Sequence, residues 1–335
     1  MNQQISSIIG WDIGSRTLEA VCLNDGAITA IQEPFTNWQK KDTLIAQLKA
    51  MSLALGTRSK IGITITATLS DAFRSKREGL TFILDAVQAA MPEDNISVFG
   101  IDGQFHPLRA VYDHPLLITT ANWLATAMAV ARYQPDGLLV DVGETTTDII
   151  PFTDAQVVTR GFNDSERLIR GELIYTGVLN TPVCAMVKRV PLKGQWCPIA
   201  GDVFATAQDV HLLLGNLTPQ QCTAPSPDGR PLTRDFSAER LARMVCADAE
   251  ILSRAAILTM AQHIEQAQIN QITEAISQVM GRIQLRGPVI AVGKGAFLVQ
   301  AAAHNLNLPC RTLTDLFTHY PVELPSATAI AYLLQ

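Results

Sequence analysis

The positions of apolar residues predict short buried strands and amphipathic helices along most of the chain. Strands are expected where β-branched residues cluster or alternate with other residues, at 8–14, 18–23, 60–67, 96–99 and 288–292. Helices are expected where apolar residues recur every three or four positions, at 42–55, 79–91, 119–133, 237–255, 256–285, 296–305 and 325–335. In the helix at 237–255, Ser237 is the predicted N-cap.

A proline–aspartate–glycine sequence at 135–137 marks the predicted boundary between two domains, because these residues end a helix and favour a turn. Beyond it, residues 138–152 (LLVDVGETTTDIIPF) predict a strand, a glycine turn and a second strand. The region that follows is richer in proline, glycine and tryptophan, which predicts irregular structure with short helices. The first domain is expected at 1–134 plus 325–335, and the second at 135–324 with an irregular insertion at about 160–235.

The Asp-x-Gly turn that ends the first predicted strand occurs again after this boundary. Residues 12–19 read DIGSRTLE and residues 141–148 read DVGETTTD. Each octet has Asp, an apolar residue and Gly, then Thr three positions further on and an acid two after that. One octet alone is a weak signal, since such turns are common. Two copies at matched positions predict duplicated halves that face each other.

Glycine turns of this kind expose backbone N–H groups that can cradle phosphate oxygens. A third glycine element, AVGKGAF at 291–297, follows a strand and opens a helix, where anionic groups often bind. The three turns therefore predict a phosphate site that comprises Gly14, Ser15, Arg16, Thr17, Gly143, Thr145, Thr146, Gly293, Lys294 and Gly295. The alternative is that all three are ordinary turns without a ligand and that Lys294 is simply exposed.

Two aspartates at the strand ends predict a magnesium site. Asp12 and Asp141 would repel a polyphosphate that approached them directly. Carboxylates can instead hold a hydrated Mg²⁺ between protein and phosphate, because this ion takes one or two carboxylates and keeps several waters. Mg²⁺ is therefore the expected cofactor, with Asp12 and Asp141 as its ligands.

Three acid–base groups are candidate catalytic residues, namely Asp148, Glu144 and His211. Glu144 is suited either to bind Mg²⁺ or to act as a base. His211 lies two positions after Asp209, so the two side chains would not face the same way on a helix. For this pair, a helix cap or a hydrogen-bonded core histidine is the commoner explanation.

Arg167, Glu172 and Tyr175 are candidate substrate-binding residues. Arg167 and Glu172 are suited to grip a carboxylate or a diphosphate, and a solvated salt-bridged loop is the alternative. Tyr175 is either a wall of the substrate pocket or part of a turn.

Composition excludes several classes of protein. The 335 residues carry 26 basic and 31 acidic side chains, for a net charge of −5, and nucleic-acid binders usually need a concentrated basic surface. The 6 cysteines form no CxxC pair, which argues against a disulfide scaffold or a zinc site. Polar residues interrupt the longest apolar stretch, 115–131, and the first residues do not resemble a signal segment. A cytoplasmic location without membrane or nucleic-acid contacts is expected.

Six stretches carry a resemblance to a known family: IGWDIG (9–14), SKREGL (75–80), DVGETTTDIIP (141–151), RLIRGELIYTGVLNTPVCAMV (167–187), FATAQDVHLLLG (204–215) and DGRPLTRDFSAERLARMVCAD (228–248). In the order of its elements (an Asp-x-Gly hairpin, an Ala-rich helix, a second Asp-x-Gly hairpin, a late Gly-x-Gly and a closing Ala-rich helix), the chain resembles the sugar kinase, heat-shock protein and actin superfamily. Within that superfamily it is similar to the hydantoinase/oxoprolinase-related family. The resemblance implies an α/β fold of two actin-like (ribonuclease H-like) domains with a phosphate-binding cleft between them.

The resemblance also implies an activity. Archaeal members of this family make a methanofuran precursor, joining a furan-methyl diphosphate to the phenol of a γ-glutamyl-tyramine unit with release of diphosphate. Similar proteins of methylotrophic bacteria are linked to tetrahydromethanopterin-dependent one-carbon transfer. The expected protein is thus a Mg²⁺-dependent transferase that acts on small diphosphate and phenolic substrates. A homodimer or a partner enzyme of the pathway is left open.

Three departures from the family pattern keep other functions open. The first turn has Gly14-Ser15 followed by Arg16 where a Gly-Gly pair is usual, Glu144 replaces a serine, and Thr68 stands where a glutamate is often found. One alternative is an ATP-dependent hydantoinase/oxoprolinase-like hydrolase or kinase. A second is a non-catalytic paralogue that partners another enzyme of the pathway.

Overall fold

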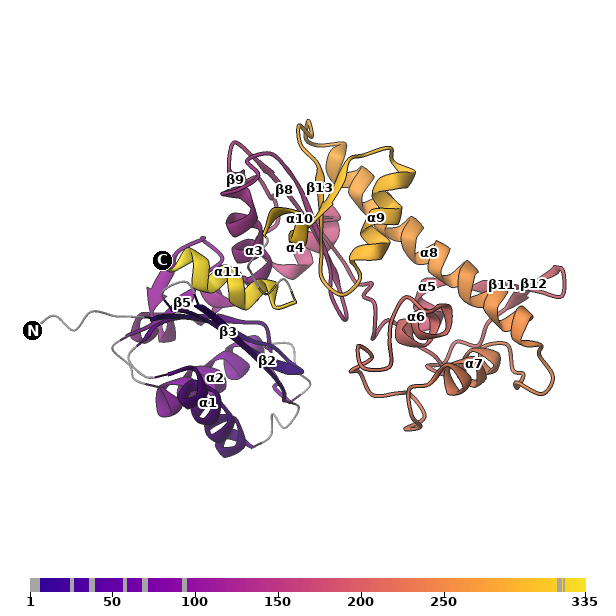
Figure 1. Cartoon of the computed structure of the whole chain (residues 1–335), viewed down its shortest axis with the longest axis horizontal. Coiled ribbons are helices and arrows are strands. Elements are labelled where there is room, and N and C mark those ends of the chain that lie inside the picture. Colours follow the sequence, from indigo (N-terminus) through magenta and orange to yellow (C-terminus); the bar gives the residue numbers. More distant parts are fainter. Residues whose placement is uncertain are drawn as a thin grey trace, which may run out of the picture. The chain divides into compact units, whose positions relative to one another are not determined.

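A computed structural model describes residues 7–24, 27–35, 40–56, 59–67, 72–91, 95–317, 321 and 323–335, so the departure at Thr68 lies outside the described residues. The chain divides into two compact units, coloured along the sequence in Figure 1. Unit 1 comprises Met1–Asp136, Phe152–Val158 and Leu313–Gln335, and unit 2 comprises Gly137–Pro151 and Thr159–Thr312. The domain boundaries and the cleft expected from the sequence stay predictions.

Unit 1 is built on a six-stranded sheet whose centre is the predicted first strand. In spatial order, its strands are β3 (Ala27–Pro34), β2 (Thr17–Asn24), β1 (Ser7–Ile13), β4 (Ser59–Ile65), β5 (Ile96–Phe99) and β6 (Phe105–Pro107). β1 pairs antiparallel with β2 and parallel with β4. β3 and β6 were not expected. β3 is an edge strand with mostly exposed side chains, so it lacks the apolar alternation that marks buried strands.

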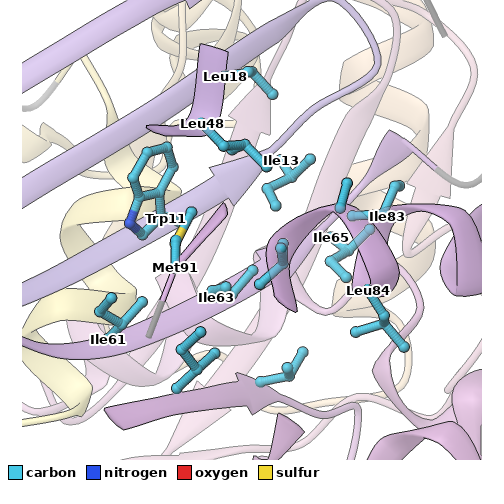
Figure 2. Packing of buried hydrophobic residues seen from close by; sticks show 14 of the residues in the cluster. Trp11, Ile13, Leu18, Leu48, Ile61, Ile63, Ile65, Ile83, Leu84 and Met91 are labelled. Carbon is cyan, nitrogen blue, oxygen red and sulfur yellow. The ribbon is translucent and has the colours of Figure 1, made fainter. Parts of the chain in front are cut away.

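The helices of unit 1 are α1 (Lys41–Leu55), α2 (Lys76–Ala90), α3 (Asn122–Ala131), α10 (Leu313–Leu316) and α11 (Pro325–Leu333), with 3₁₀ turns η3 (Leu108–Tyr112) and η4 (Pro115–Ile118). The helix expected at 119–133 is therefore shorter at both ends. Helices α1 and α2 lie on one face of the sheet and α11 lies on the other (Figure 1). Figure 2 shows the core between the sheet and α1 and α2, where Trp11, Ile13 and Ile63 pack with Leu48 and Ile83.

On the other face, α11 lies directly on the backbone of β1. A Cβ added at Gly10 would overlap the backbone of Ala327 and Ala331. No side chain fits at this contact, since glycine alone lets strand and helix approach so closely. The predicted helix at 325–335 is thus confirmed, and Gly10 explains how it packs.

Gly10→Ala is expected to lower the free energy of unfolding by about 2–3 kcal/mol, because the added methyl group must push α11 off the sheet. Gly201→Ala is the matched control, since a Cβ there has no neighbour within 4 Å. Urea unfolding of both variants tests the expectation. Equal stability of the two variants would contradict the packing described here.

Unit 2 has a five-stranded path whose centre is the second Asp-x-Gly strand. Its order is β10 (Leu173–Ile174), β8 (Thr147–Thr153), β7 (Gly137–Val142), β13 (Val289–Val292) and β14 (Cys310–Thr312). The end of β8 continues into the segment Phe152–Val158 of unit 1, where it pairs with β9 (Gln156–Val157). In unit 2, β11 (Arg189–Leu192) and β12 (Gln195–Pro198) form a separate hairpin. β7 pairs parallel with β13, as β1 does with β4 in unit 1.

Unit 2 contains α4 (Asp164–Arg170), α5 (Val183–Met186), α6 (Ala207–Leu214), α7 (Arg234–Arg243), α8 (Arg254–Met280) and α9 (Ala296–Asn305). The helix predicted at 237–255 was wrong at both ends. Thr233 is the true N-cap of α7, and its side chain accepts a hydrogen bond from the backbone N–H of Phe236. Ser237 is buried inside the helix and donates to Asp209 instead. Within the described ranges, no helix combines the length and the apolar character that a membrane crossing needs.

Candidate phosphate and metal site

The two Asp-x-Gly turns have the same local geometry. In unit 1, the backbone N–H of Gly14 donates to the carbonyl oxygen of Thr17 at 2.9 Å. In unit 2, Gly143 donates to Thr146 at 2.9 Å in the same way. These bonds turn the chain within four residues and leave Ser15 exposed at the tip of the first turn, next to the exposed Arg16. The repeat seen in the sequence is therefore also a structural repeat.

Asp12 lies buried at the end of β1, directly before the first turn. Its Oδ1 accepts a hydrogen bond from Oγ1 of Thr66 at 3.0 Å. Burial raises the pKa of Asp12 to about 6, while hydrogen bonds from Thr66 and Ser326 act in the opposite direction. A buried carboxylate held at a raised pKa is a common feature of functional sites. The Thr66 and Ser326 contacts are long-range, so the local sequence did not indicate them.

In unit 2, the glycine element at 293–295 lies against the end of β7. A Cβ at Gly293 would overlap Asp141 Oδ1 and the carbonyl oxygen of Val142, and its φ is +82°, a value that favours glycine. The backbone N–H of Gly295 donates to Val142 at 3.0 Å. The structure thus brings Asp141 and Gly293 together, and Gly295 lies against Val142, the residue after Asp141.

Lys294 and Glu144 form an ion pair in the same place. Lys294 Nζ lies 2.6 Å from Glu144 Oε1, and the two side chains are 30% and 22% exposed. Thr223 Oγ1 donates to the same carboxylate oxygen at 3.1 Å. Plain exposure of Lys294, the alternative left open above, is therefore wrong. Sequence reasoning missed Thr223, because no local motif marks it.

The rest of the second turn is clamped by the segment after β10. Asn180 Nδ2 donates to Thr145 Oγ1 at 3.1 Å, and a Cβ at Gly177 would overlap the backbone of Thr145. Thr147, two positions after Thr145, is buried and donates to the carbonyl oxygen of Thr176 at 2.6 Å. The backbone that would cradle phosphate is therefore rigidly supported.

Residues 222–230, which carry Thr223, are fixed by a charged network. Gln208 Nε2 donates to the carbonyl oxygen of Ala224 at 3.2 Å. Asp228 accepts hydrogen bonds from Arg230, from Arg240 at 3.0 Å and from Arg243 at 3.1 Å. Burial alone would raise the pKa of Asp228, but the Arg230 hydrogen bonds and the charge of Arg240 bring it well below its usual range.

Arg240 connects this network to the interior of unit 2. It is fully buried and pairs with Asp209, also fully buried, at 2.7 Å. Asp209 additionally accepts from the backbone N–H of Thr206 and so belongs to the capping box of α6. The helix cap expected as one explanation for Asp209 is confirmed.

The candidate substrate residues Arg167 and Glu172 lie inside the protein. Arg167 is 1% exposed, pairs with Asp148 at 2.9 Å and donates to the carbonyl oxygen of Glu172 at 3.0 Å. The Glu172 carboxylate is buried and accepts from the backbone N–H of Gly161 at 2.8 Å. The solvated loop considered as the alternative is therefore wrong. Tyr175 is 67% exposed.

Asp148 is the candidate acid–base residue within this buried group. Burial raises its pKa, while the neighbouring Arg167 lowers it. Its side chain keeps 16% of its surface exposed, whereas that of Arg167 keeps 2%. Asp148 thus combines a raised pKa, an orienting cation and access to solvent.

His211, the third candidate catalytic residue, has the geometry of a core histidine. It is fully buried, and its Nε2 lies 2.9 Å from Oε1 of Gln268. Burial lowers the pKa of His211 to about 4, and the hydrogen bond with Gln268 only partly offsets this. The imidazole is therefore neutral near pH 7.

This shift predicts a loss of stability at mildly acidic pH. Because the folded pKa of about 4 lies below the ordinary 6.5, the contribution of His211 to stability is complete above pH 6.5 and falls as the pH drops toward 4. The loss should reach about 3 kcal/mol in total. Urea unfolding at pH 7 and at pH 4.5 should show that His211→Gln becomes more stable relative to the wild type by about 2–3 kcal/mol as the pH falls, because the opposite contribution of Asp12 is common to both proteins. The control His304→Gln, at an exposed position of α9, should retain the wild-type slope.

Among the described residues, no cluster of three or more His, Cys, Asp or Glu side chains is arranged to hold a metal ion. Asp12 and Asp141 are carboxylates at separate strand ends, each within its own unit. Each carboxylate taken by itself suits Mg²⁺, which needs only one or two protein carboxylates when water and phosphate supply its other ligands. The raised pKa of Asp12 also fits, because a cation would stabilise its ionised form.

Comparison with known proteins identifies the family. The hydantoinase/oxoprolinase family model matches residues 58–331. A (4-{4-[2-(gamma-L-glutamylamino)ethyl]phenoxymethyl}furan-2-yl)methanamine synthase of Methanocaldococcus jannaschii is 30% identical over 302 residues, 90% of each chain. A synthase of the same name from Methanococcus vannielii is 30% identical over 169 residues, 50% of this chain and 75% of that one.

The fold also has a counterpart among solved structures. The nucleotide-free structure of acetone carboxylase superposes with a TM-score of 0.53 at 10% identity, covering 98% of this chain and 69% of that one. At this identity the likeness concerns the fold alone, and it agrees with the α/β class expected from the sequence. Because the family model matches residues 58–331 and the Methanocaldococcus synthase is similar over 90% of the chain, this chain belongs to the hydantoinase/oxoprolinase family.

Proposed function

We propose that this protein is a diphosphate-releasing transferase of methanofuran-type cofactor biosynthesis, which serves tetrahydromethanopterin-linked one-carbon transfer. Its substrates are an aminomethylfuran-methyl diphosphate and a phenolic acceptor of the tyramine or glutamyl-tyrosine type. The similarity to the Methanocaldococcus synthase over 90% of both chains carries the proposal. The name of that relative describes a phenoxymethyl-furan, and this aryl ether is the bond that the reaction forms.

In the proposed reaction, the phenol oxygen attacks the furan methylene carbon and the carbon–oxygen bond to diphosphate breaks. The leaving diphosphate carries the electron pair of that bond away, and the phenol proton passes to a base. Asp148 is the proposed base, because burial raises its pKa and Arg167 orients it. Arg167 is then a positioning residue, since it is almost fully buried.

The glycine turns and Lys294 are the proposed diphosphate-binding groups, through backbone N–H donors and one ammonium. Asp12 and Asp141 are the proposed Mg²⁺ ligands, and the bound ion would neutralise charge on the leaving group. Two observations support these roles, namely the matched turn geometry and the packing of Gly293 against Asp141.

The test is an assay of diphosphate release by the purified protein with both substrates and Mg²⁺. Release that requires both substrates and stops with EDTA is expected. No release under these conditions would overturn the assigned reaction. ADP formation from ATP under the same conditions would favour the hydrolase or kinase alternative instead.

A further inference from the structure

The positive charge of Lys294, in the glycine element at 293–295, is paired with the negative charge of Glu144. Lys294 Nζ lies 2.6 Å from Glu144 Oε1, and less than a third of either side chain is exposed. Exposed ion pairs contribute little and exchange readily with water. A half-buried pair at this distance is a stronger contact, because solvent screens it less.

A second contact shows that this pair is built into the fold. Thr223 donates to the same Glu144 oxygen at 3.1 Å, and its Oγ1 lies 3.5 Å from Lys294 Nζ. The segment that carries Thr223 is itself fixed. Gln208 donates a hydrogen bond to the carbonyl oxygen of the next residue, Ala224. Asp228 of the same segment accepts hydrogen bonds from three arginines. The hydrogen bond from Thr223, which lies on this fixed segment, therefore holds the Glu144 carboxylate in contact with Lys294.

We propose that Glu144 is a resident anion of this site, which a phosphate group must displace from Lys294 in order to bind. The inference rests on the proposed function, in which Lys294 contacts the diphosphate. A carboxylate and a phosphate in contact with one ammonium repel each other strongly, because both charges are partly shielded from water. Glu144 thus sets the anion affinity of the site and excludes weakly charged anions.

Isosteric replacement of Glu144 tests this role. Glu144→Gln removes the competing charge and keeps an oxygen that can accept the Thr223 hydrogen bond. Calorimetric titration with inorganic diphosphate in EDTA should show binding roughly tenfold tighter than in the wild type. Lys294→Met should weaken binding. The matched control Glu274→Gln, at an exposed position of α8, should change nothing.

The double variant separates displacement from general charge repulsion. If Glu144 acts by occupying Lys294, its replacement should give no gain in the Lys294→Met background. An equal gain in both backgrounds, or no gain in Glu144→Gln alone, overturns the proposal. Thermal unfolding verifies that each variant is folded. If neither wild type nor Glu144→Gln binds diphosphate, the inference is wrong, while the synthase assay decides the proposed function separately.

Discussion

Asp12→Asn should abolish the proposed transferase activity and at the same time make the protein more stable. The folded pKa of Asp12 is about 6, above the ordinary 3.8, because the carboxyl group is buried. Its favourable contribution is therefore complete below pH 3.8 and is lost as the pH rises through 6. At pH 7.5 the ionised carboxylate costs about 3 kcal/mol relative to a neutral group. Asparagine is neutral and can keep the Thr66 hydrogen bond.

The measurement pairs urea unfolding in EDTA with the diphosphate-release assay in Mg²⁺. Asp12→Asn should gain up to about 3 kcal/mol at pH 7.5 and little at pH 4. Activity should fall by at least about 10²- to 10³-fold, as when a charge-stabilising group is removed. Asp113→Asn, at an exposed position of unit 1, should change neither quantity. A variant that is both less stable and fully active would contradict this account of Asp12.

Arg240→Met should cause the largest loss of stability among these variants. Arg240 and Asp209 are both fully buried and lie 2.7 Å apart. Removing the guanidinium leaves the Asp209 charge without its cation, which typically costs about 3–5 kcal/mol. Asp228 loses one of its three arginine partners at the same time.

A neighbouring arginine provides the matched control. Arg243 also contacts Asp228, at 3.1 Å, but its side chain is 41% exposed. Arg243→Met should therefore cost less than about 1 kcal/mol. Urea unfolding of both variants at pH 7.5 gives the comparison. Similar losses for the two would mean that burial does not determine the strength of these pairs.

The structural parts that could be predicted from sequence are those determined by neighbouring residues. The turns at Gly14 and Gly143 each depend on a hydrogen bond to a residue three positions away, so an octet contains the whole signal. Strand β1 and helix α9 also follow from short apolar patterns. For these elements, local sequence and final fold agree.

The remaining features depend on contacts between distant segments. In the sequence Ser237 resembles an N-cap, but in the structure its hydroxyl donates a hydrogen bond to Asp209, 28 residues away. Thr223 reaches Glu144 across 79 residues. His211 depends on Gln268, 57 residues further along. Periodicity and short motifs contain no information about such pairs, so sequence reasoning identified several of the residue types but not their partners.

The packing of α11 on β1 has a consequence for the order of folding during synthesis. Gly10 of β1 packs directly against the backbone of α11, and the side chain of Ser326 forms a hydrogen bond with Asp12. Lys60 Nζ also donates a hydrogen bond to the carbonyl oxygen of Leu334 at 2.7 Å. The ribosome makes this helix only after Gly137–Thr312, nearly all of which belongs to unit 2. Unit 1, although begun first, is therefore completed only when its last helix is made, and the face of β1 that α11 covers stays uncovered until then.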